Sequence, residues 1–496
     1  MSDLVLAIDQ GTTGSTIALM DADGGLLTSI NHEFPQIFPK PGWVEHDPES
    51  IWESVLKGLA AIFVDGRYSP KDVSAIGITN QRETAVLWDA ETGKAVHNAI
   101  VWQCRRTTEV CEKLKAEGHE AHIKARSGLV LDPYFSATKF KWLLDNAPEA
   151  QALLAQGRLR AGTIDSYLIW RLSAGQAHKT DVSNASRTSL MALDSLSWDD
   201  ELLSIFEVPR EILPEICPSS GRFAVTSGVA GLPDGLPISG VAGDQQSALF
   251  GQACFAAGDA KCTFGTGSFI LMNAGETPVA SESGLLSTVA WQLEGQPPVY
   301  ALEGGAFVCG AAVQWLRDQL GIIESAPEVE ALAQTVDDSG GVEFVPALAG
   351  LGAPYWAPDA RGTLTGLTRG SGRGEIARAT LDAMALQNAD ILKAMENDIG
   401  GRMQSLKVDG GASANNFLMQ LQADYLARPI TRPEVIETTV AGACFLAGLG
   451  EGVWDSPNEV SNVWRSEKSF NVELSDAARA ERIASWRSAV EKTLQN

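Results

Sequence analysis

Two segments in different halves of the chain share one pattern of strand, Gly/Thr turn and strand, and this repetition constrains the fold most strongly. The first, LVLAIDQGTTGSTIALM, covers residues 4–20, and the second, TFGTGSFILM, covers residues 263–272. Apolar runs of strand length on both sides of a short polar turn predict a β-hairpin in each place. Because the unit recurs, we expect two related halves with a boundary near residue 250.

The tip of the first hairpin carries groups that suit a phosphate held with a metal ion. Asp9 offers a carboxylate, Thr12 and Thr13 offer hydroxyls, and Gly11 and Gly14 allow a tight turn and close approach to a ligand. Loop N–H groups and hydroxyls bind phosphate oxygens in such sites, while an acid holds Mg²⁺. The alternative is an ordinary hairpin whose polar side chains only satisfy the turn.

The composition limits the classes of function that are open to the chain. With 496 residues, 45% hydrophobic and 20% charged, the sequence is typical of a folded protein with more than one domain. The net charge of −24 opposes nonspecific binding to nucleic acid or anionic membranes, since both need basic surface. The N-terminus lacks the features of a signal peptide or a membrane span, which predicts a cytoplasmic protein without membrane insertion.

The cysteines indicate a reduced protein. They number seven, are widely scattered and form no CxxC pair, so neither a disulfide framework nor a zinc site is expected. Cys254 and Cys262 lie in apolar, strand-like segments, where a free cysteine behaves as a small buried hydrophobic residue.

Polar clusters follow several predicted strands. The strand at 73–79 ends in NQRET, and the segment 237–273 is predicted to contain a strand, a loop bearing Asp244, an apolar stretch and the second hairpin. In open α/β sheets, ligands bind beyond the carboxyl ends of strands. A third glycine turn, at 410–411, either presents amides to an anion or only joins a strand to a helix. Apolar spacing predicts helices over 51–64, 310–320, 375–398, 415–426 and 438–452.

The way in which phosphates would be held also limits the fold. Neither GxxxxGK[ST] nor GxGxxG occurs, so a P-loop and a Rossmann fingerprint are excluded. Two hairpins that face each other across a cleft describe the architecture shared by actin, hexokinase and the heat-shock chaperone ATPases. We therefore predict an α/β protein with two similar actin/hexokinase-like (ribonuclease H-like) domains flanking a cleft, comprising residues 1–250 and 251–496.

Motifs spread in order over nearly the whole chain carry a family resemblance. They include DQGTT at 9–13, GITNQRET at 77–84, NAIVWQCRRT at 98–107, GLVLDPYFSATK at 128–139, GDQQSALFGQ at 243–252, FGTGSF at 264–269 and VDGGASANNF at 408–417. With these motifs the sequence resembles the FGGY family of carbohydrate kinases, and most closely its members that act on glycerol. The resemblance implies ATP-dependent phosphorylation of glycerol to sn-glycerol 3-phosphate, with Mg²⁺.

The resemblance also implies roles for individual residues. It makes Asp244 the general base for the attacking hydroxyl, and Asp9 and Asp244 the metal ligands. The implied glycerol contacts are Arg82, Glu83, Trp102, Tyr134, Asp244, Gln245 and Phe269, with Trp102 and Phe269 as walls against the carbon chain. The implied nucleotide contacts are Thr12, Thr13, Gly14, Thr266, Gly267, Gly310, Gln314, Gly411 and Asn415. Taken singly, Gln314 also fits an exposed helix position and Asn415 a helix N-cap.

The sequence departs from the family pattern in places that bear on affinity and regulation. Thr16 stands where these kinases often have Arg, which removes a cation near the phosphates, so we expect the nucleotide affinity to differ from that of these kinases. Residues 218–240 contain no His, and the loop GVAGLPDGLP within them lacks Arg and Lys. Residues 468–490 lack a match to the carrier-protein docking site of enteric relatives. Regulation by fructose 1,6-bisphosphate, by histidine phosphorylation or by a carrier protein is therefore not expected. The resemblance also implies a homodimer or homotetramer.

Two other functions remain open at the level of sequence. One is a different FGGY kinase, acting on a pentulose or another polyol, although Arg82, Glu83, Trp102 and Tyr134 favour glycerol. The other is a non-catalytic nucleotide switch of the actin or chaperone kind, which needs no polyol pocket. Replacement of Asp244 separates the kinase from the switch, because only the kinase requires a base.

Overall fold

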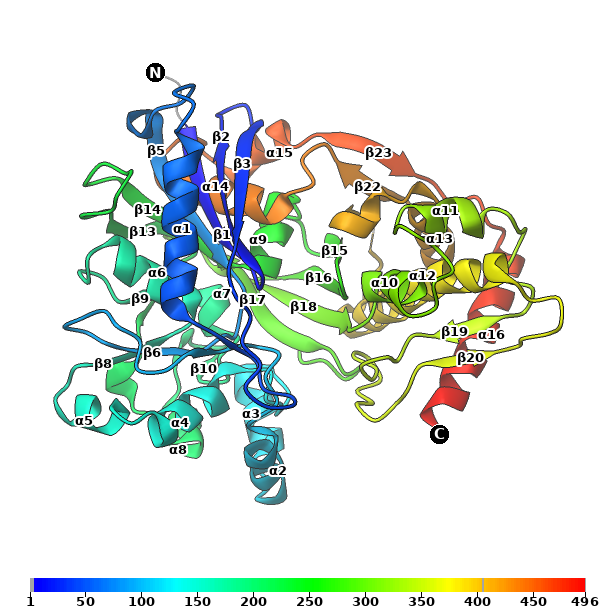
Figure 1. The fold of residues 1–496 in the computed structure, drawn as a ribbon, viewed down its shortest axis with the longest axis horizontal. Helices are drawn as coiled ribbons and strands as arrows, with labels where there is room; N and C mark the ends of the chain where they lie inside the picture. The colour runs from blue at the N-terminus through cyan, green and yellow to red at the C-terminus, as the bar shows by residue number, and fades with distance from the viewer. Residues whose placement is uncertain (1–3, 404–405, 496) are drawn as a thin grey trace.

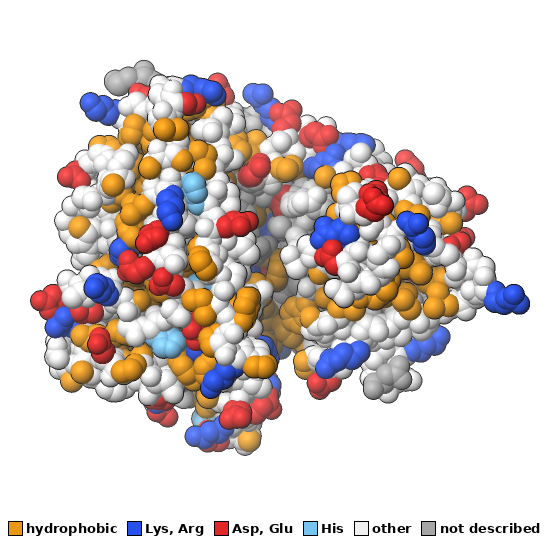
Figure 2. Space-filling model, in the orientation of Figure 1, with side chains coloured by type: hydrophobic (Ala, Val, Ile, Leu, Met, Phe, Trp, Pro, Cys, Tyr) orange, Lys and Arg blue, Asp and Glu red, His pale blue; other side chains and the backbone are white. Residues whose placement is uncertain are grey.

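Two lobes lie side by side in the computed structural model, which describes residues 4–403 and 406–495 (Figure 1). One lobe contains the early part of the chain, and the other contains most of its second half. The surface is deeply hollowed between the two lobes (Figure 2). Each lobe is organised around one sheet.

The first sheet has six strands in the described part of the chain, in the order β13-β14-β5-β1-β2-β3. The strands are β1 (Leu4–Gln10), β2 (Gly14–Met20), β3 (Leu26–Glu33), β5 (Val73–Asn80), β13 (Ser220–Val225) and β14 (Pro237–Gly243). β1 pairs antiparallel with β2 and parallel with β5, and β5 pairs parallel with β14. The first predicted hairpin is therefore confirmed.

The second sheet has seven strands among the described residues, in the order β17-β18-β16-β15-β21-β22-β23. The strands are β15 (Ala260–Phe264), β16 (Ser268–Gly275), β17 (Leu286–Gln292), β18 (Pro298–Ala306), β21 (Leu406–Asp409), β22 (Ile430–Pro433) and β23 (Ser466–Phe470). From β18 to β23, the order and direction of the strands repeat those from β3 to β13. This repeat confirms the predicted fold of two similar α/β domains.

Helices cover the sheets and extend each lobe. They are α1 (Pro48–Ile62), α2 (Thr108–Ala116), α3 (Glu120–Ser127), α4 (Ser136–Asn146), α5 (Ala150–Ala155), α6 (Ile164–Leu172), α7 (Val182–Ala185), α8 (Asp200–Phe206), α9 (Asp244–Gly251), α10 (Gly310–Asp318), α11 (Glu328–Ala333), α12 (Arg373–Ile399), α13 (Asn416–Leu426), α14 (Thr438–Gly450), α15 (Pro457–Val463) and α16 (Asp476–Leu494). The five helices predicted from apolar spacing correspond to α1, α10, α12, α13 and α14. Asp47 begins α1 as its N-cap by accepting the backbone N–H groups of Glu49 and Ser50.

Short strands and turns complete the chain. The short strands are β4 (Glu45–His46), β6 (Val86–Asp89), β7 (Ala99–Ile100), β8 (Leu159–Gly162), β9 (Lys179–Asp181), β10 (Met191–Ala192), β11 (Ser197–Trp198), β12 (Glu215–Cys217), β19 (Glu343–Val345) and β20 (Thr363–Thr365). The 3₁₀ turns are Pro70–Asp72, Arg210–Ile212 and Gly411–Ala414.

Helix α14 comes from the second half of the chain but packs on the first sheet. A Cβ atom added to Gly77 on β5 would lie 2.1 Å from the carbonyl oxygen of Ala443, and one added to Gly240 on β14 would lie 2.2 Å from the nitrogen of Ala447. The dense small residues of this segment therefore permit close helix packing, as predicted. Because α14 crosses to the first lobe, the division into 1–250 and 251–496 remains a prediction.

The structure bears on two further expectations from composition. Within the described residues, no helix is both long and apolar enough to cross a bilayer. All seven cysteines are unpaired, and Cys254 and Cys262 are buried as predicted.

Candidate active site

The carboxyl ends of β1, β5 and β14 bring the two predicted metal ligands to one edge of the first sheet. Asp9 on β1 and Ala242 on β14 pair with the same β5 residue, Thr79, from opposite sides. Asp244 follows Ala242 by two positions, so both acids emerge at the same edge. The prediction of a loop around Asp244 is wrong, because Asp244 is the first residue of α9, directly after Gly243 at the end of β14. The N-terminal end of a helix favours the negative charge of this carboxylate.

The electrostatics of this pair fit a bound cation. Burial, and then the charge of Asp244, raise the pKa of Asp9 to about 7. Burial also raises the pKa of Asp244, although Arg82 opposes this shift. The Asp244 side chain retains 32% of its exposure, so a ligand can reach it. Two neighbouring carboxylates with water access are oxygen donors that suit Mg²⁺, which commonly binds one or two carboxylates together with phosphate.

Arg82 and Glu83, from the cluster after β5, lie buried beside Asp244. The Nε of Arg82 lies 3.0 Å from Oδ1 of Asp244, and its Nη1 donates to Oε1 of Gln246 at 3.2 Å. Glu83 has a left-handed backbone with φ of +60°, which is rare for a residue with a side chain, and its Oε1 accepts from Nε of Arg187 at 2.7 Å. The structure therefore brings together the predicted donor, the predicted acceptor and the predicted base.

Trp102 and Tyr134 form an aromatic corner that joins the polyol side to the first hairpin. Their ring centroids are 5.7 Å apart in an edge-to-face arrangement. The indole Nε1 of Trp102 donates to Oγ1 of Thr12 at 3.1 Å, which links a predicted wall to a predicted phosphate contact. Burial raises the pKa of Tyr134 above its ordinary value, so its hydroxyl stays neutral and can donate and accept. Lys139, fully buried on α4, donates to the carbonyl oxygens of Tyr134 and Phe135 and so holds this loop.

Gln245 and Phe269 approach the site from the second sheet's side. The Oε1 of Gln245 accepts a hydrogen bond from Nζ of Lys261 on β15, and the same Nζ donates to Oγ1 of Thr263 at 2.9 Å. Phe269 on β16 lies against Gly305, where an added Cβ would come within 3.0 Å of its ring. Of the predicted polyol contacts, Gln245 is thus bonded to a residue of the second sheet, and Phe269 lies within that sheet.

The glycine turns of the second half also meet at one sheet edge. Thr263 on β15 pairs with Asp409 on β21, so the turn at 265–267 and the turn at 410–411 emerge together. Gly410 has φ of +84°, and an added Cβ would lie 2.7 Å from the carbonyl oxygen of Phe264. Backbone, rather than side chains, therefore builds this part of the site.

The N-terminus of α10 is tied to the second hairpin. The amides of Gly310 and Ala311 donate to the carbonyl oxygens of Gly265 and Thr266 at 2.9 and 3.0 Å. The N–H of Gly310 therefore has its hydrogen-bond partner within the protein. A Cβ atom added to Gly310 would lie 2.6 Å from the carbonyl oxygen of Gly265. The absence of a Cβ at Gly310 permits the close approach of α10, and its role as a nucleotide contact stays a prediction.

The remaining predicted nucleotide contacts differ in their exposure. Thr13, Thr266, Gly411 and Gln314 are exposed, while Gly14 and Gly267 are buried within their hairpins. Oδ1 of Asn415 accepts the N–H of Leu418 at 2.8 Å, so Asn415 is the N-cap of α13. Its amide NH₂ group and the second lone pair of Oδ1 are then left for a ligand.

Sequence reasoning missed four buried charged residues beside the site: Lys139, Arg187, Lys261 and Glu303. Lys261 and Glu303 are single charges within otherwise apolar strands, and Arg187 follows α7 in the polar run SNASRTS. A lone charge in a buried strand is the signal that could have found Lys261 and Glu303, because such charges are almost always paired.

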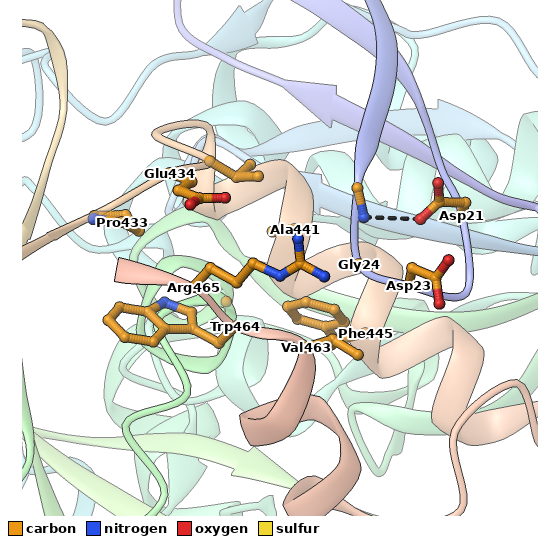
Figure 3. A pocket seen from close by; sticks show the side chains of 13 residues that line it. Asp21, Asp23, Gly24, Pro433, Glu434, Ala441, Phe445, Val463, Trp464 and Arg465 are labelled. Carbon is orange, nitrogen blue, oxygen red and sulfur yellow. Dashed lines mark hydrogen bonds between the residues drawn. The ribbon is translucent and has the colours of Figure 1, made fainter. Parts of the chain in front are cut away.

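A separate hollow of about 270 Å³ lies between the β2–β3 turn and residues 433–435 and 463–465. Figure 3 shows the Arg465 side chain extending across it toward the turn that carries Asp21 and Asp23. None of the residues lining this hollow belongs to the predicted site.

The comparisons with known proteins are consistent over the whole chain. Residues 4–251 match the model of the N-terminal domain of the FGGY family of carbohydrate kinases, and residues 260–451 match that of its C-terminal domain. The glycerol kinase of Bdellovibrio bacteriovorus is 57% identical over 492 residues, which cover 99% of each chain. The glycerol kinase of Symbiobacterium thermophilum is 54% identical and covers 98% of each chain.

Solved structures agree with the sequence relatives. A crystal structure of Plasmodium falciparum glycerol kinase with ADP superposes with a TM-score of 0.93 at 36% identity, covering 99% of this chain and 98% of that one. A xylulose kinase from Lactobacillus acidophilus has a TM-score of 0.87 at 22% identity, covering 99% of this chain and 97% of that one, which supports the fold alone.

Proposed function

The chain belongs to the FGGY family of carbohydrate kinases, and from this premise we propose that it transfers the γ-phosphoryl group of ATP to glycerol, forming sn-glycerol 3-phosphate. One observation carries the proposal. Arg82, Glu83 and Asp244 converge at the edge of the first sheet, and Trp102 joins this group to the first hairpin through Thr12. Hydroxyl-binding side chains and a phosphate-binding turn then share one site, as phosphoryl transfer requires.

Asp244 acts as the general base on the attacking hydroxyl. Within the described residues, both polar contacts of its carboxylate engage Oδ1, which accepts from its neighbour's backbone N–H at 2.7 Å and faces Arg82 at 3.0 Å. Oδ2 is then the oxygen that accepts the hydroxyl proton. The raised pKa strengthens this carboxylate as a base, since proton transfer is most effective when the pKa approaches the working pH.

The remaining polyol contacts follow from their chemistry. Arg82 donates to one hydroxyl, Glu83 accepts from another, Tyr134 does either, and Gln245 adds an amide. Trp102 and Phe269 enclose the carbon chain between aromatic faces. A pocket that pairs every hydroxyl rejects analogues that lack one, because its own buried groups would be left unpaired.

The nucleotide side would hold Mg²⁺-ATP. The metal, when bound, neutralises charge on the phosphate oxygens, and Asp9 and Asp244 are the residues that would hold it. Thr12, Thr13, Gly14, Thr266 and Gly267 approach the phosphates from the two hairpins, and Gly411 and Asn415 approach the nucleoside. Closure of the lobes would exclude water as a competing acceptor.

The partners and location that accompany this function remain predictions. We expect a cytoplasmic homodimer or homotetramer, with glycerol and ATP as its ligands and with no nucleic-acid or membrane partner. We also expect no regulation by fructose 1,6-bisphosphate, histidine phosphorylation or a carrier protein.

An acceptor panel tests the function. Initial rates with ATP are measured for glycerol, propane-1,2-diol, erythritol and xylulose, with an acceptor-free reaction as control. We expect glycerol to have the highest kcat/KM, and propane-1,2-diol to fall by at least a hundredfold. A higher kcat/KM for xylulose or erythritol would assign a different FGGY substrate, and ATP hydrolysis without acceptor phosphorylation would indicate a nucleotide switch.

A further inference from the structure

A buried network of four charged side chains spans the two lobes behind the acceptor side of the site. It contains Arg82 and Glu83 from the loop after β5, Arg187 from the loop after α7, and Glu303 from β18 of the second sheet. All four are almost completely buried, with exposures of 3% or less. β18 runs through the middle of the molecule, between the two lobes (Figure 1). The network therefore joins the lobes by charge.

Glu303 pairs with the two terminal nitrogens of the Arg82 guanidinium. Its carboxylate contacts both Nη1 and Nη2 of Arg82, the latter at 3.1 Å, and Oε1 also accepts from Nη2 of Arg187 at 2.8 Å. Such bidentate pairing fixes the plane of a guanidinium as well as its position. The Nε edge of Arg82 is then left to face Asp244 at 3.0 Å. Glu303 thus determines which edge of Arg82 is presented to the reacting group.

Arg187 has the matching role for Glu83. Its Nε donates to Glu83 at 2.7 Å, and its guanidinium lies over the rings of Tyr134 and Phe135 at 5.7 and 5.3 Å. Its Nη1 is buried without a hydrogen-bond partner among the described residues. A buried donor left unpaired is uncommon and calls for a ligand or a water molecule. Arg187 therefore borders Glu83 and Tyr134, two of the predicted hydroxyl contacts, and keeps one donor free beside them.

The charges show why this network is unlike an ordinary stabilising ion pair. Arg82 and Arg187 face three carboxylates, those of Glu83, Asp244 and Glu303. Burial alone would raise the pKa of Glu303, but Arg187 and Arg82 hold it at about 2, so Glu303 remains charged. Desolvating so many ions offsets much of their attraction, and apolar residues would fill the same space at less cost. The arrangement is better explained by what it positions.

We propose that Glu303 and Arg187 are positioning residues for the acceptor site: Glu303 holds Arg82 from the second lobe, and Arg187 holds Glu83. The inference rests on the proposed function, because it assigns a role to residues that hold two of the predicted polyol contacts in place. It makes the acceptor site incomplete without β18. Without Glu303, the Arg82 fork has Asp244 and Glu83 as its remaining carboxylate partners, so the guanidinium turns toward the base and away from the substrate hydroxyl.

Substitution of Glu303 by Gln tests this role, with Glu343→Gln as the matched control. Glu343 on β19 is also buried and also paired with an arginine, Arg482, but it lies outside the network. For each variant the KM values for glycerol and ATP, kcat and the melting temperature are measured. For Glu303→Gln we expect the glycerol KM to rise at least tenfold and the ATP KM to change less than twofold. Glu303→Asp, which keeps the charge, should recover part of the loss.

The outcomes separate positioning from simple stability. If Glu303→Gln lowers the melting temperature as Glu343→Gln does but leaves the glycerol KM and kcat within twofold of wild type, the positioning role is wrong. If Glu303→Gln does not fold, the Arg187→Lys variant is measured instead. It keeps the positive charge but loses the guanidinium that bridges Glu83 and Glu303. An unchanged glycerol KM in this variant would overturn the proposal. Wild-type turnover of glycerol is measured first, so failure of the proposed function shows there and is distinct from failure of these variants.

Discussion

The acceptor side of the candidate site is built from buried side chains, whereas the nucleotide side is built from backbone at glycine turns. On the acceptor side, buried side chains carry the contacts, as in the chain from Glu83 through Arg187 and Glu303 to Arg82 and Asp244. On the nucleotide side, glycine turns at 11–14, 265–267 and 410–411 place backbone close to backbone. The acceptor side should therefore depend on charge and hydrogen-bonding groups, and the nucleotide side on the absence of Cβ atoms.

The largest expected effect is on the acceptor side, at Asp244. Asp244→Asn keeps the size of the side chain but removes the base, and general-base catalysis is commonly worth about 10²–10⁴ in rate. We expect kcat for glycerol phosphorylation to fall by roughly 10³-fold. Nucleotide binding, measured by titration calorimetry with ATP, should survive. A variant that still phosphorylates glycerol at more than a tenth of the wild-type rate would refute the base assignment.

On the nucleotide side, two adjacent glycines offer a matched pair. In Gly410→Ala the new Cβ would meet the Phe264 backbone at 2.7 Å with a left-handed φ of +84°, and strain of this kind costs about 1–3 kcal/mol. In Gly411→Ala the Cβ meets nothing within 4 Å. Urea unfolding should show a loss of about 2–3 kcal/mol for Gly410→Ala and little change for Gly411→Ala.

The Gly411→Ala variant then reports on the ligand alone. Because Gly411 is a predicted nucleotide contact, its ATP KM should rise while its glycerol KM stays near that of wild type. Equal losses of stability in both variants would contradict the view that close backbone packing, and not glycine content as such, shapes this turn.

Acid should weaken the support of the first hairpin through His46. Burial lowers the pKa of His46 to about 4, and the ring is hydrogen-bonded to Gln36 and Gln81. The side-chain amides of these two glutamines donate to the carbonyl oxygens of Thr12 and Gly11 in the first hairpin. The unfolded chain binds this proton with a pKa of about 6.5, so between pH 6.5 and 4 the unfolded state holds more protons and stability falls as the pH falls. From pH 7 to 5 this amounts to about 2 kcal/mol.

Urea unfolding at the two pH values measures this effect in wild type and in His46→Gln. Because glutamine does not titrate in this range, the variant should lose less stability on acidification than wild type does. The same dependence on pH in both proteins would exclude His46 as the group responsible.

The smallest expected effect is that of Thr16 on nucleotide affinity. Thr16 on β2 pairs across the hairpin with Asp9, and its hydroxyl accepts a hydrogen bond from Asn31 at 2.9 Å. Thr16→Arg adds a cation beside the predicted metal and phosphate site, where a charge pair in partial contact with water is worth up to about 1 kcal/mol. The ATP dissociation constant should fall by about two- to fivefold. A weaker affinity would mean that Asn31 and Thr16 already satisfy this position.

The sequence predicted the parts of the molecule that depend on local patterns. The two hairpins follow from apolar runs interrupted by glycine and threonine, and helices such as α12 follow from their apolar spacing. Proximity of Asp9 and Asp244 followed only from family resemblance, whereas the structure gives it a cause in their shared partner Thr79.

What the sequence could not show depends on contacts between distant segments. Glu303 lies 221 positions after Arg82 along the chain, and nothing in a strand that reads PVYALEGGA says which arginine its single acid will meet. Helix α14 was recognisable as a helix, but its assignment to the first sheet depends on contacts with Gly77 and Gly240. The helix start at Asp244 was missed because the strand, the glycine and the helix follow one another without a loop.

The most direct test of the central claim is product formation by the purified wild-type protein with ATP, Mg²⁺ and glycerol, followed by phosphorus NMR. If the acceptor side and the nucleotide side form one kinase site, glycerol 3-phosphate and ADP should appear in equal amounts, and neither should appear at a comparable rate without glycerol. Formation of ADP and inorganic phosphate without glycerol 3-phosphate would contradict the claim.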